Sequence, residues 1–189
     1  MSNSEPRASR QLILVTGPAR SGKSEWAETL AADSGKQVIY VATGLVDAAD
    51  LEWLDRLEQH RNRRPPDWQT LEVPIGLSAV ARSAAQSECL LIDSLGTWTA
   101  NLLEQEQAVW EQTQQDLIAS LKSTAADAIF VAEETGWGVV PAYPAGRLFR
   151  DRLGTLVRHI SAIADTVYLA TGGYALNLTA LGTPLGAKN

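Results

Sequence analysis

Residues 17–24 read Gly-Pro-Ala-Arg-Ser-Gly-Lys-Ser, which matches the phosphate-loop pattern G-x-x-x-x-G-K-[ST] at every fixed position. The apolar run Leu12-Ile13-Leu14-Val15 directly precedes the loop, and residues 25–32 have the composition of a helix. A strand, a glycine-containing loop and a helix in this order aim backbone N–H groups and the positive end of the helix dipole at one point. The stretch therefore predicts a polyphosphate site, because this context disfavours the alternative of a chance glycine turn.

The residue types of the loop have separate expected roles. Gly17 and Gly22 let the backbone approach the phosphates, Lys23 reaches the β- and γ-phosphates as a catalytic cation, and the Ser24 hydroxyl binds Mg²⁺. The predicted phosphate-binding residues are Gly17, Pro18, Ala19, Arg20, Ser21, Gly22, Lys23 and Ser24.

The composition bounds the class of protein. The chain has 189 residues, 45% of them hydrophobic, and about one domain is expected at this length. We expect a flexible tail over residues 1–10, a single nucleotide-binding catalytic domain over 11–177 and a loosely ordered tail over 178–189. No segment approaches the ~20 apolar residues of a membrane span, and the first ten residues lack the apolar core of a signal peptide. A cytoplasmic location is the corresponding expectation.

Charge and cysteine content exclude two further classes. The formal net charge of −6 argues against a general nucleic-acid binder, because such proteins need basic surface to neutralise phosphates. The single cysteine, Cys89, builds no internal disulfide framework, and its place in an apolar run favours an inert strand thiol.

Apolar runs alternate with segments of helical length along the chain. The runs lie at residues 12–15, 38–42, 90–92, 128–131 and 167–170, and the predicted helices at about 24–34, 47–63, 104–124 and 147–164. This alternation predicts βαβ units, and hence an α/β fold with a mostly parallel sheet covered by helices on both faces. Residues 68–73 could form a short edge strand, since Pro74 ends it.

Asp93 ends the run Leu90-Leu91-Ile92 and has the form of a Walker B acid that would hold Mg²⁺ directly or through water. The alternative is a turn-opening residue, because Asp commonly follows strands for that reason. Pairing with the phosphate loop favours the metal role, since a nucleoside triphosphate site needs a carboxylate for its cation.

His60 stands immediately before Arg61, in a segment that continues through Asn62, Arg63 and Arg64. A neutral imidazole is a competent nucleophile toward phosphorus, and nearby guanidinium groups would stabilise the transferring phosphoryl group. The alternative is a polar surface or capping residue. His159 has no comparable setting and is expected to be structural or interfacial.

Two glutamates are further candidates. Glu72 could accept hydrogen bonds from guanine N1–H and N2–H₂, an edge that adenine does not offer, or it is simply an exposed strand residue. Glu134 ends the strand predicted at 128–131 and precedes two glycines of a loop that could close over a site, or it is a solvated turn residue.

The order of these segments resembles the adenosylcobinamide kinase/adenosylcobinamide-phosphate guanylyltransferase family from about residue 12 to 169. The specific features are the loop, the His60 and arginine segment, and the block Glu134-Thr135-Gly136-Trp137-Gly138-Val139-Val140-Pro141. Supporting segments are Val38 to Thr43, Trp68 to Glu72, Leu91 to Asp93, Thr99 to Leu103 and Arg147 to Asp151.

The resemblance implies a RecA-like phosphate-loop fold and two successive reactions. A nucleoside triphosphate, ATP or GTP, phosphorylates adenosylcobinamide; His60 then takes GMP from GTP as a phosphoramidate and passes it to adenosylcobinamide phosphate, giving adenosylcobinamide-GDP. It also implies Mg²⁺ and a homotrimer. The nucleotide site carried over comprises residues 17–24, Ala42, Thr43, Gly44, Arg61, Asn62, Arg63, Arg64, Glu72 and Asp93, with His60 and Lys23 catalytic and Ser24 and Asp93 on the metal.

Three departures from the family pattern concern substrate contacts more than nucleotide binding. Pro18 replaces a glycine and removes one N–H donor, Glu133 replaces an Asn, and Val157-Arg158 replaces Asn-Gln. Two other functions stay open. A simple phosphate-loop kinase for a small metabolite would leave His60 uninvolved, and a nucleotide-switched regulatory or strand-exchange module is disfavoured by the acidic chain.

Overall fold

The computed structural model describes residues 10–45 and 64–185. Its centre is a seven-stranded sheet with the strand order β3-β2-β4-β5-β1-β6-β7. Every neighbouring pair in the sheet is parallel except β6 and β7. The strands are β1 (Leu12–Gly17), β2 (Gln37–Ala42), β3 (Gln69–Glu72), β4 (Glu88–Asp93), β5 (Asp127–Glu133), β6 (Thr166–Thr171) and β7 (Tyr174–Asn177).

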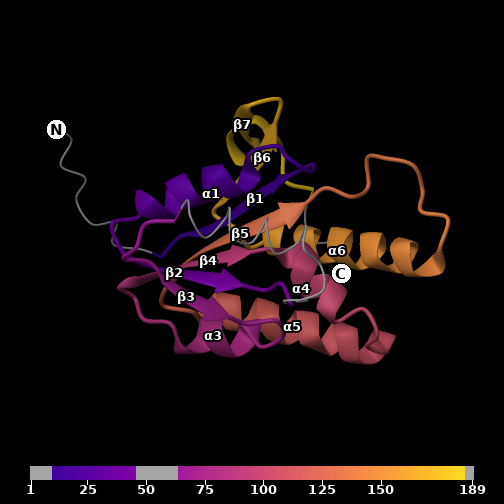
Figure 1. Cartoon of the computed structure of the whole chain (residues 1–189), viewed down its shortest axis with the longest axis horizontal. Helices are drawn as coiled ribbons and strands as arrows, with labels where there is room; N and C mark the ends of the chain where they lie inside the picture. The colour runs from indigo at the N-terminus through magenta and orange to yellow at the C-terminus, as the bar shows by residue number, and fades with distance from the viewer. Residues whose placement is uncertain (1–9, 46–63, 186–189) are drawn as a thin grey trace.

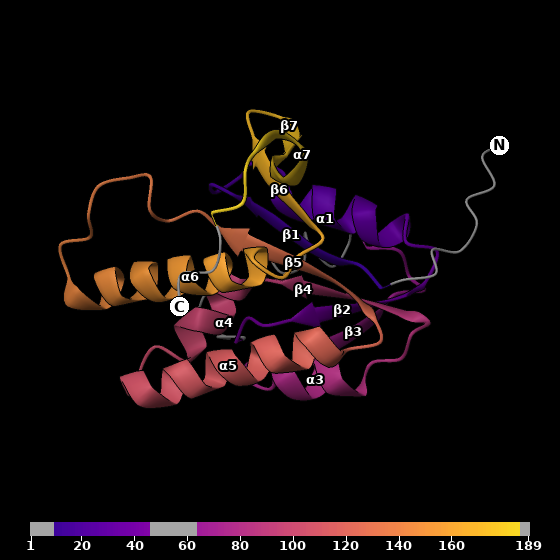
Figure 2. The same cartoon turned by 180° about the vertical axis from the view of Figure 1, so that it is seen from behind.

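Helices cover both faces of this sheet (Figure 1). They are α1 (Lys23–Ala32), α3 (Leu77–Ser83), α4 (Leu95–Asn101), α5 (Gln107–Ser123), α6 (Pro144–Ser161) and α7 (Leu178–Leu181). Helix α1 lies on one face, and α3, α4, α5 and α6 pack against the other, as Figure 2 shows from behind. The predicted α/β fold with a mostly parallel, doubly covered sheet is therefore confirmed.

The five predicted strands and the edge strand β3 are all present, and β3 pairs in parallel with β2. The helix predicted at 24–34 corresponds to α1, the one at 104–124 to α5, and the one at 147–164 to α6, which starts three residues earlier because Pro144 occupies its first turn. The helix predicted at 47–63 lies outside the described residues. Helix α7 lies at the start of the segment that we expected to be loosely ordered.

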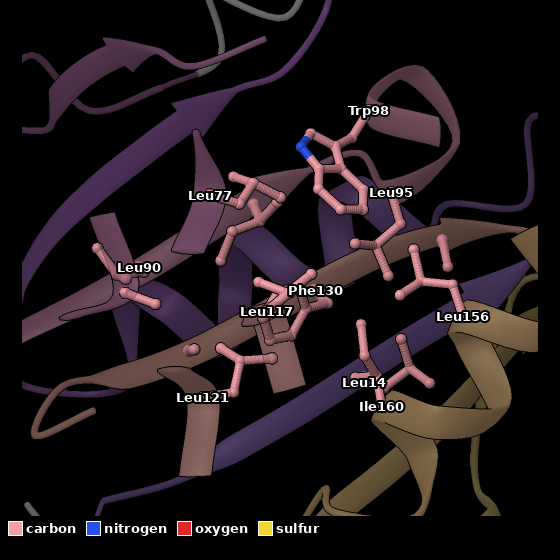
Figure 3. Packing of buried hydrophobic residues seen from close by; sticks show 14 of the residues in the cluster. Leu14, Leu77, Leu90, Leu95, Trp98, Leu117, Leu121, Phe130, Leu156 and Ile160 are labelled. Carbon is pink, nitrogen blue, oxygen red and sulfur yellow. The ribbon is translucent and has the colours of Figure 1, made fainter. Parts of the chain in front are cut away.

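Two hydrophobic clusters form the core, one on each face of the sheet. The cluster on the α1 face joins residues such as Val15, Tyr40 and Val131 to Ala27 and Ala31 of the helix. The larger cluster fills the opposite face and includes the fully buried Trp110. Trp98 and Phe130 are also fully buried there, among leucines (Figure 3). Apolar side chains on both faces explain why the central strands read as continuous hydrophobic runs.

The register of the strands brings the predicted site residues to one edge of the sheet. Ala42 at the end of β2 is level with Glu72 of β3 on one side and with Asp93 of β4 on the other. Gly17 at the end of β1 is level with Glu133 of β5. Because parallel strands end at the same edge, residues separated by more than 100 positions in the chain lie along one line, which is where open α/β sheets bind ligands.

Candidate phosphate-binding site

The phosphate-loop stretch forms the turn between β1 and α1. Gly22 has φ 86°, Arg20 has φ 58°, and the helix begins as the Trp26 N–H donates to the Gly22 carbonyl at 2.9 Å. Gly17 has no room for a side chain, because a Cβ there would lie 2.3 Å from the Ala170 carbonyl oxygen and 2.7 Å from Ser21 Oγ. The two glycines of the pattern are therefore required for different reasons. Gly17 is closely approached by the Ala170 carbonyl and the Ser21 side chain, and Gly22 has a left-handed backbone conformation.

Lys23 starts α1, and its Nζ donates to the Pro18 carbonyl at 3.3 Å. The lysine therefore folds back over the loop that its backbone terminates. A helix N-terminus with a cation above it favours a phosphate group. Pro18 contributes no N–H to the loop, and its carbonyl instead holds the lysine.

Asp93 lies at the carboxyl end of β4, and its Oδ2 accepts a hydrogen bond of 3.1 Å from the Tyr40 hydroxyl. Within the described ranges no group of three or more His, Cys, Asp or Glu side chains gathers as a metal site. Mg²⁺ does not require such a cage, because it commonly takes one or two carboxylates and completes its shell with phosphates and water. The hydroxyl of Ser24 and the carboxylate of Asp93 are hard oxygen donors that fit this ion.

Strand β5 lies between β4 and β1, so its last residue, Glu133, stands between Asp93 and the phosphate loop. Ser94 Oγ donates to Glu133 Oε1 at 2.6 Å, while the buried Oε2 has no hydrogen-bond partner. Burial is the main cause that raises the pKa of this carboxyl, against the Ser94 hydrogen bond and the charge of Lys23, which lower it. The carboxyl packs so tightly on Gly96 that a Cβ at Gly96 would lie 2.0 Å from Oε2.

Glu134 is positioned by β1, because the Thr16 hydroxyl donates to its Oε1 at 2.9 Å. The loop that follows, residues 135–143, extends away from the sheet before α6 begins (Figure 1). It carries exposed apolar side chains, with Trp137 64% and Val139 95% exposed. Glu134 therefore lies between the carboxyl end of β5 and this loop, and its side chain is held by the hydrogen bond from Thr16.

Thr43 follows β2 and is completely buried. Its hydroxyl donates to the Ser94 carbonyl at 2.7 Å and contacts the Thr97 hydroxyl, and the Asn101 amide donates to the carbonyls of Thr43 and Pro74 at 2.7 and 2.9 Å. These bonds fasten the ends of β2 and β3 to helix α4. Ala42 and Gly44, the neighbours of Thr43, are half-buried at the same edge.

Arg64 lies over the ring of Tyr40, with Cζ 3.3 Å from the ring centroid, and its Nη1 donates to Thr70 Oγ1 at 3.4 Å. Glu72 lies two residues beyond Thr70 on β3 and is exposed. Arg64 thus lies over β2 and contacts β3, while Glu72 and Asp93 end the two strands that flank β2. The other predicted residues of the histidine segment, His60, Arg61, Asn62 and Arg63, lie outside the described residues.

The structure adds residues that contact the predicted site residues and that the sequence did not single out, among them Tyr40, Ser94, Thr97 and Asn101. Tyr40 could have been noticed, because it alternates with Ala42 on β2 and so lies on the same face of the sheet. Ser94 and Thr97 form a capping box at the start of α4, with threonine in place of the usual Glu or Gln.

A strand that leads into this glycine-containing turn and a helix, with Asp93 ending a second strand on the far side of β5, defines a phosphate-loop nucleotide-binding protein. None of the helices in the described ranges is both long and apolar enough to cross a bilayer. The family model for cobinamide kinase / cobinamide phosphate guanyltransferase matches residues 13–178, and the chain belongs to this family. It is accordingly a transferase of cobalamin biosynthesis, and the family resemblance predicted from the sequence is confirmed.

Curated relatives match over nearly their whole length. The bifunctional adenosylcobalamin biosynthesis protein CobP of Pseudomonas aeruginosa is 40% identical over 175 residues, covering 91% of this chain and 98% of the relative. CobU of Escherichia coli is 34% identical over 183 residues, covering 88% and 99%. Among solved structures, a Pyrococcus horikoshii protein, Project ID PH0250, is similar in fold alone, with a TM-score of 0.54 at 8% identity over 94% of each chain.

Proposed function

We propose that this chain carries out two transfers: phosphorylation of adenosylcobinamide by ATP or GTP, then transfer of GMP from GTP to adenosylcobinamide phosphate. Two relatives of this chain, CobP and CobU, are named as bifunctional adenosylcobalamin biosynthesis proteins. The observation that carries the proposal is that the phosphate loop and Asp93 lie at the same end of the parallel strands, with Arg64 over the ring of Tyr40, whose hydroxyl donates to Asp93. Arg64 lies four residues after His60 in the chain, which supports a role for that segment in the reaction.

In the first transfer, the loop N–H groups and Lys23 hold the triphosphate, and the hydroxyl oxygen of adenosylcobinamide attacks the γ-phosphorus. The bond from that phosphorus to the bridging oxygen breaks, the nucleoside diphosphate leaves and the hydroxyl proton is released. Positioning and charge supply most of the catalysis in such reactions. Mg²⁺, held by Ser24 and Asp93, would supply positive charge to the phosphate oxygens.

In the second transfer, a nitrogen of His60 attacks the α-phosphorus of GTP and pyrophosphate leaves. The phosphate oxygen of adenosylcobinamide phosphate then attacks the same phosphorus, the P–N bond breaks and free histidine is restored. Glu72, exposed at the end of β3, is our candidate for the group that recognises guanine. A homotrimer and a cytoplasmic location complete the proposal and rest on the family resemblance alone.

Labelling separates this proposal from a simple phosphate-loop kinase. The protein is incubated with Mg²⁺ and GTP labelled at the α-phosphate, and the denatured protein is tested for bound label. We expect a covalent GMP adduct that is labile to acid and stable to alkali, as a P–N bond is, and that maps to His60. The His60→Ala variant should carry no label yet still phosphorylate adenosylcobinamide from γ-labelled ATP. Label on another residue, or none on the wild type, would refute the covalent step.

A further inference from the structure

Tyr40 contacts two groups that the proposed function assigns to phosphate and metal. Its hydroxyl donates to Asp93 Oδ2 at 3.1 Å, and its ring lies 3.3 Å beneath the Arg64 guanidinium carbon. The tyrosine is only 4% exposed and lies within strand β2, between β3 and β4 in the sheet. One buried side chain therefore touches both the candidate metal carboxylate and the nearest described arginine of the histidine segment.

The hydroxyl of Tyr40 is a permanent donor. A tyrosine hydroxyl is protonated at neutral pH and donates to a neighbouring carboxylate. The phenol therefore keeps its proton, and Asp93 accepts that hydrogen bond on Oδ2. No other side-chain hydrogen bond to Asp93 is present in residues 10–45 and 64–185. The contact fixes one carboxylate oxygen and leaves Oδ1 without a side-chain hydrogen bond among the described residues.

The ring of Tyr40 holds Arg64 more than hydrogen bonds do. Arg64 donates from Nη1 to Thr70 at a long 3.4 Å, and its buried Nε has no hydrogen-bond partner. A guanidinium stacked on an aromatic face is held in one plane, with its edge donors directed outward. Arg64 thus depends on the ring for its orientation, and loss of the ring would free a long, charged side chain.

We propose that Tyr40 is a positioning residue with two separable roles: its hydroxyl orients Asp93 for Mg²⁺, and its ring orients Arg64 for the triphosphate. The inference rests on the proposed function, because it takes the nucleotide and its cation as the ligands of this edge. Deleting the hydroxyl should change the metal requirement alone. Deleting the ring should weaken nucleotide binding even when the metal is saturating.

The test measures equilibrium binding of a fluorescent GTP analogue while Mg²⁺ is titrated. Tyr40→Phe should raise the Mg²⁺ concentration for half-maximal binding by about 10-fold or more, as expected for one lost hydrogen bond to a charged group, with the affinity at saturating Mg²⁺ unchanged. Tyr168→Phe is the matched control, because Tyr168 packs against the same core cluster and makes an edge-to-face contact with Trp26 instead. A Mg²⁺ requirement for Tyr40→Phe equal to that of the control would overturn the first role.

The second role is tested with Tyr40→Leu, Arg64→Gln and their combination at saturating Mg²⁺. Each single variant should weaken GTP binding by about 10-fold, and the double variant by no more than either, because each single variant removes the same contact between the ring and the guanidinium. Additive losses would overturn the role. If circular dichroism shows that Tyr40→Leu does not fold, Arg64→Lys replaces it. Lysine keeps the charge without the planar stack, so this variant should lose as much GTP affinity as Arg64→Gln does. Retained GTP affinity in Arg64→Lys would refute the stacking argument.

These outcomes are distinguishable from failure of the proposed function. A wild-type protein that forms no GMP adduct refutes the guanylyl transfer step. A wild-type protein that forms the adduct, with Tyr40 variants that bind Mg²⁺ and GTP as the wild type does, refutes only the inference on Tyr40.

Discussion

Substitution of Gly17 by alanine tests the phosphate loop at its tightest point. The added Cβ would lie 2.3 Å from the Ala170 carbonyl oxygen and 3.3 Å from its carbon, both backbone atoms of β6 that cannot rotate away. The closest ordinary carbon–oxygen contacts are about 3.3 Å, so the end of β1 must shift by roughly 1 Å. Overpacking of this kind costs about 1–3 kcal/mol of folding free energy, and a shift of that size costs about 100-fold in a step that depends on alignment.

Two measurements check the Gly17→Ala prediction: the free energy of unfolding in urea, and the dissociation constant of Mg²⁺-GTP. We expect a loss of about 1–3 kcal/mol of stability, and nucleotide affinity weakened by at least about 10-fold, which corresponds to 1.4 kcal/mol. Gly136→Ala is the control, because a Cβ at Gly136 meets no atom within 4 Å and its backbone needs no positive φ. If Gly17→Ala binds GTP as well as Gly136→Ala does, the position of the end of β1 does not determine how the loop binds the phosphates.

Three further predictions address the site edge. Lys23→Ala should remove both transfers, lowering each turnover by about 1,000-fold, because both begin with a triphosphate in the same loop; near-normal turnover in either assay would show another donor site. Glu72→Gln should weaken GTP binding by about 1–3 kcal/mol and leave ATP binding unchanged, since only guanine offers paired donors; equal losses would show that Glu72 does not recognise the base. Glu133→Gln should raise the free energy of unfolding relative to the wild type, and by more at pH 8 than at pH 5. Burial raises the pKa of Glu133 in the folded state. The free energy of unfolding of the wild type therefore falls as the pH rises from the ordinary glutamate pKa through the pKa of Glu133 in the folded state. Urea unfolding at both pH values measures this, and a gain independent of pH would exclude titration of Glu133 as its cause.

The elements that sequence predicted well are those whose signal is local. The phosphate loop can be recognised from eight consecutive residues. The central strands can be recognised as apolar runs, because both of their faces are buried. The ends of parallel strands indicate where a site lies, which is why Asp93, taken together with the phosphate loop, could be predicted as a site residue. Helices α3 and α4 were missed because seven residues make two turns, too few to show a period.

The contacts that complete the site were beyond local reasoning. Tyr40 and Asp93 are 53 residues apart in the chain, and Ser94 and Glu133 are 39 apart, so only the register of the sheet brings them together. Sequence marked Glu133 as a departure from the family pattern, but its burial against Gly96 depends on how α4 packs across β5. Side-chain partners across strands follow from tertiary packing rather than from the period of a single element.

The most direct test of the account is the product formed from adenosylcobinamide, GTP and Mg²⁺ by the purified protein, identified by mass spectrometry. We predict adenosylcobinamide-GDP from the wild type, with adenosylcobinamide phosphate as the intermediate, and accumulation of that phosphate alone from the His60→Ala variant. A wild-type reaction that stops at adenosylcobinamide phosphate, or a variant that still forms the GDP product, would contradict the claim that one chain performs both transfers, the second of them through His60.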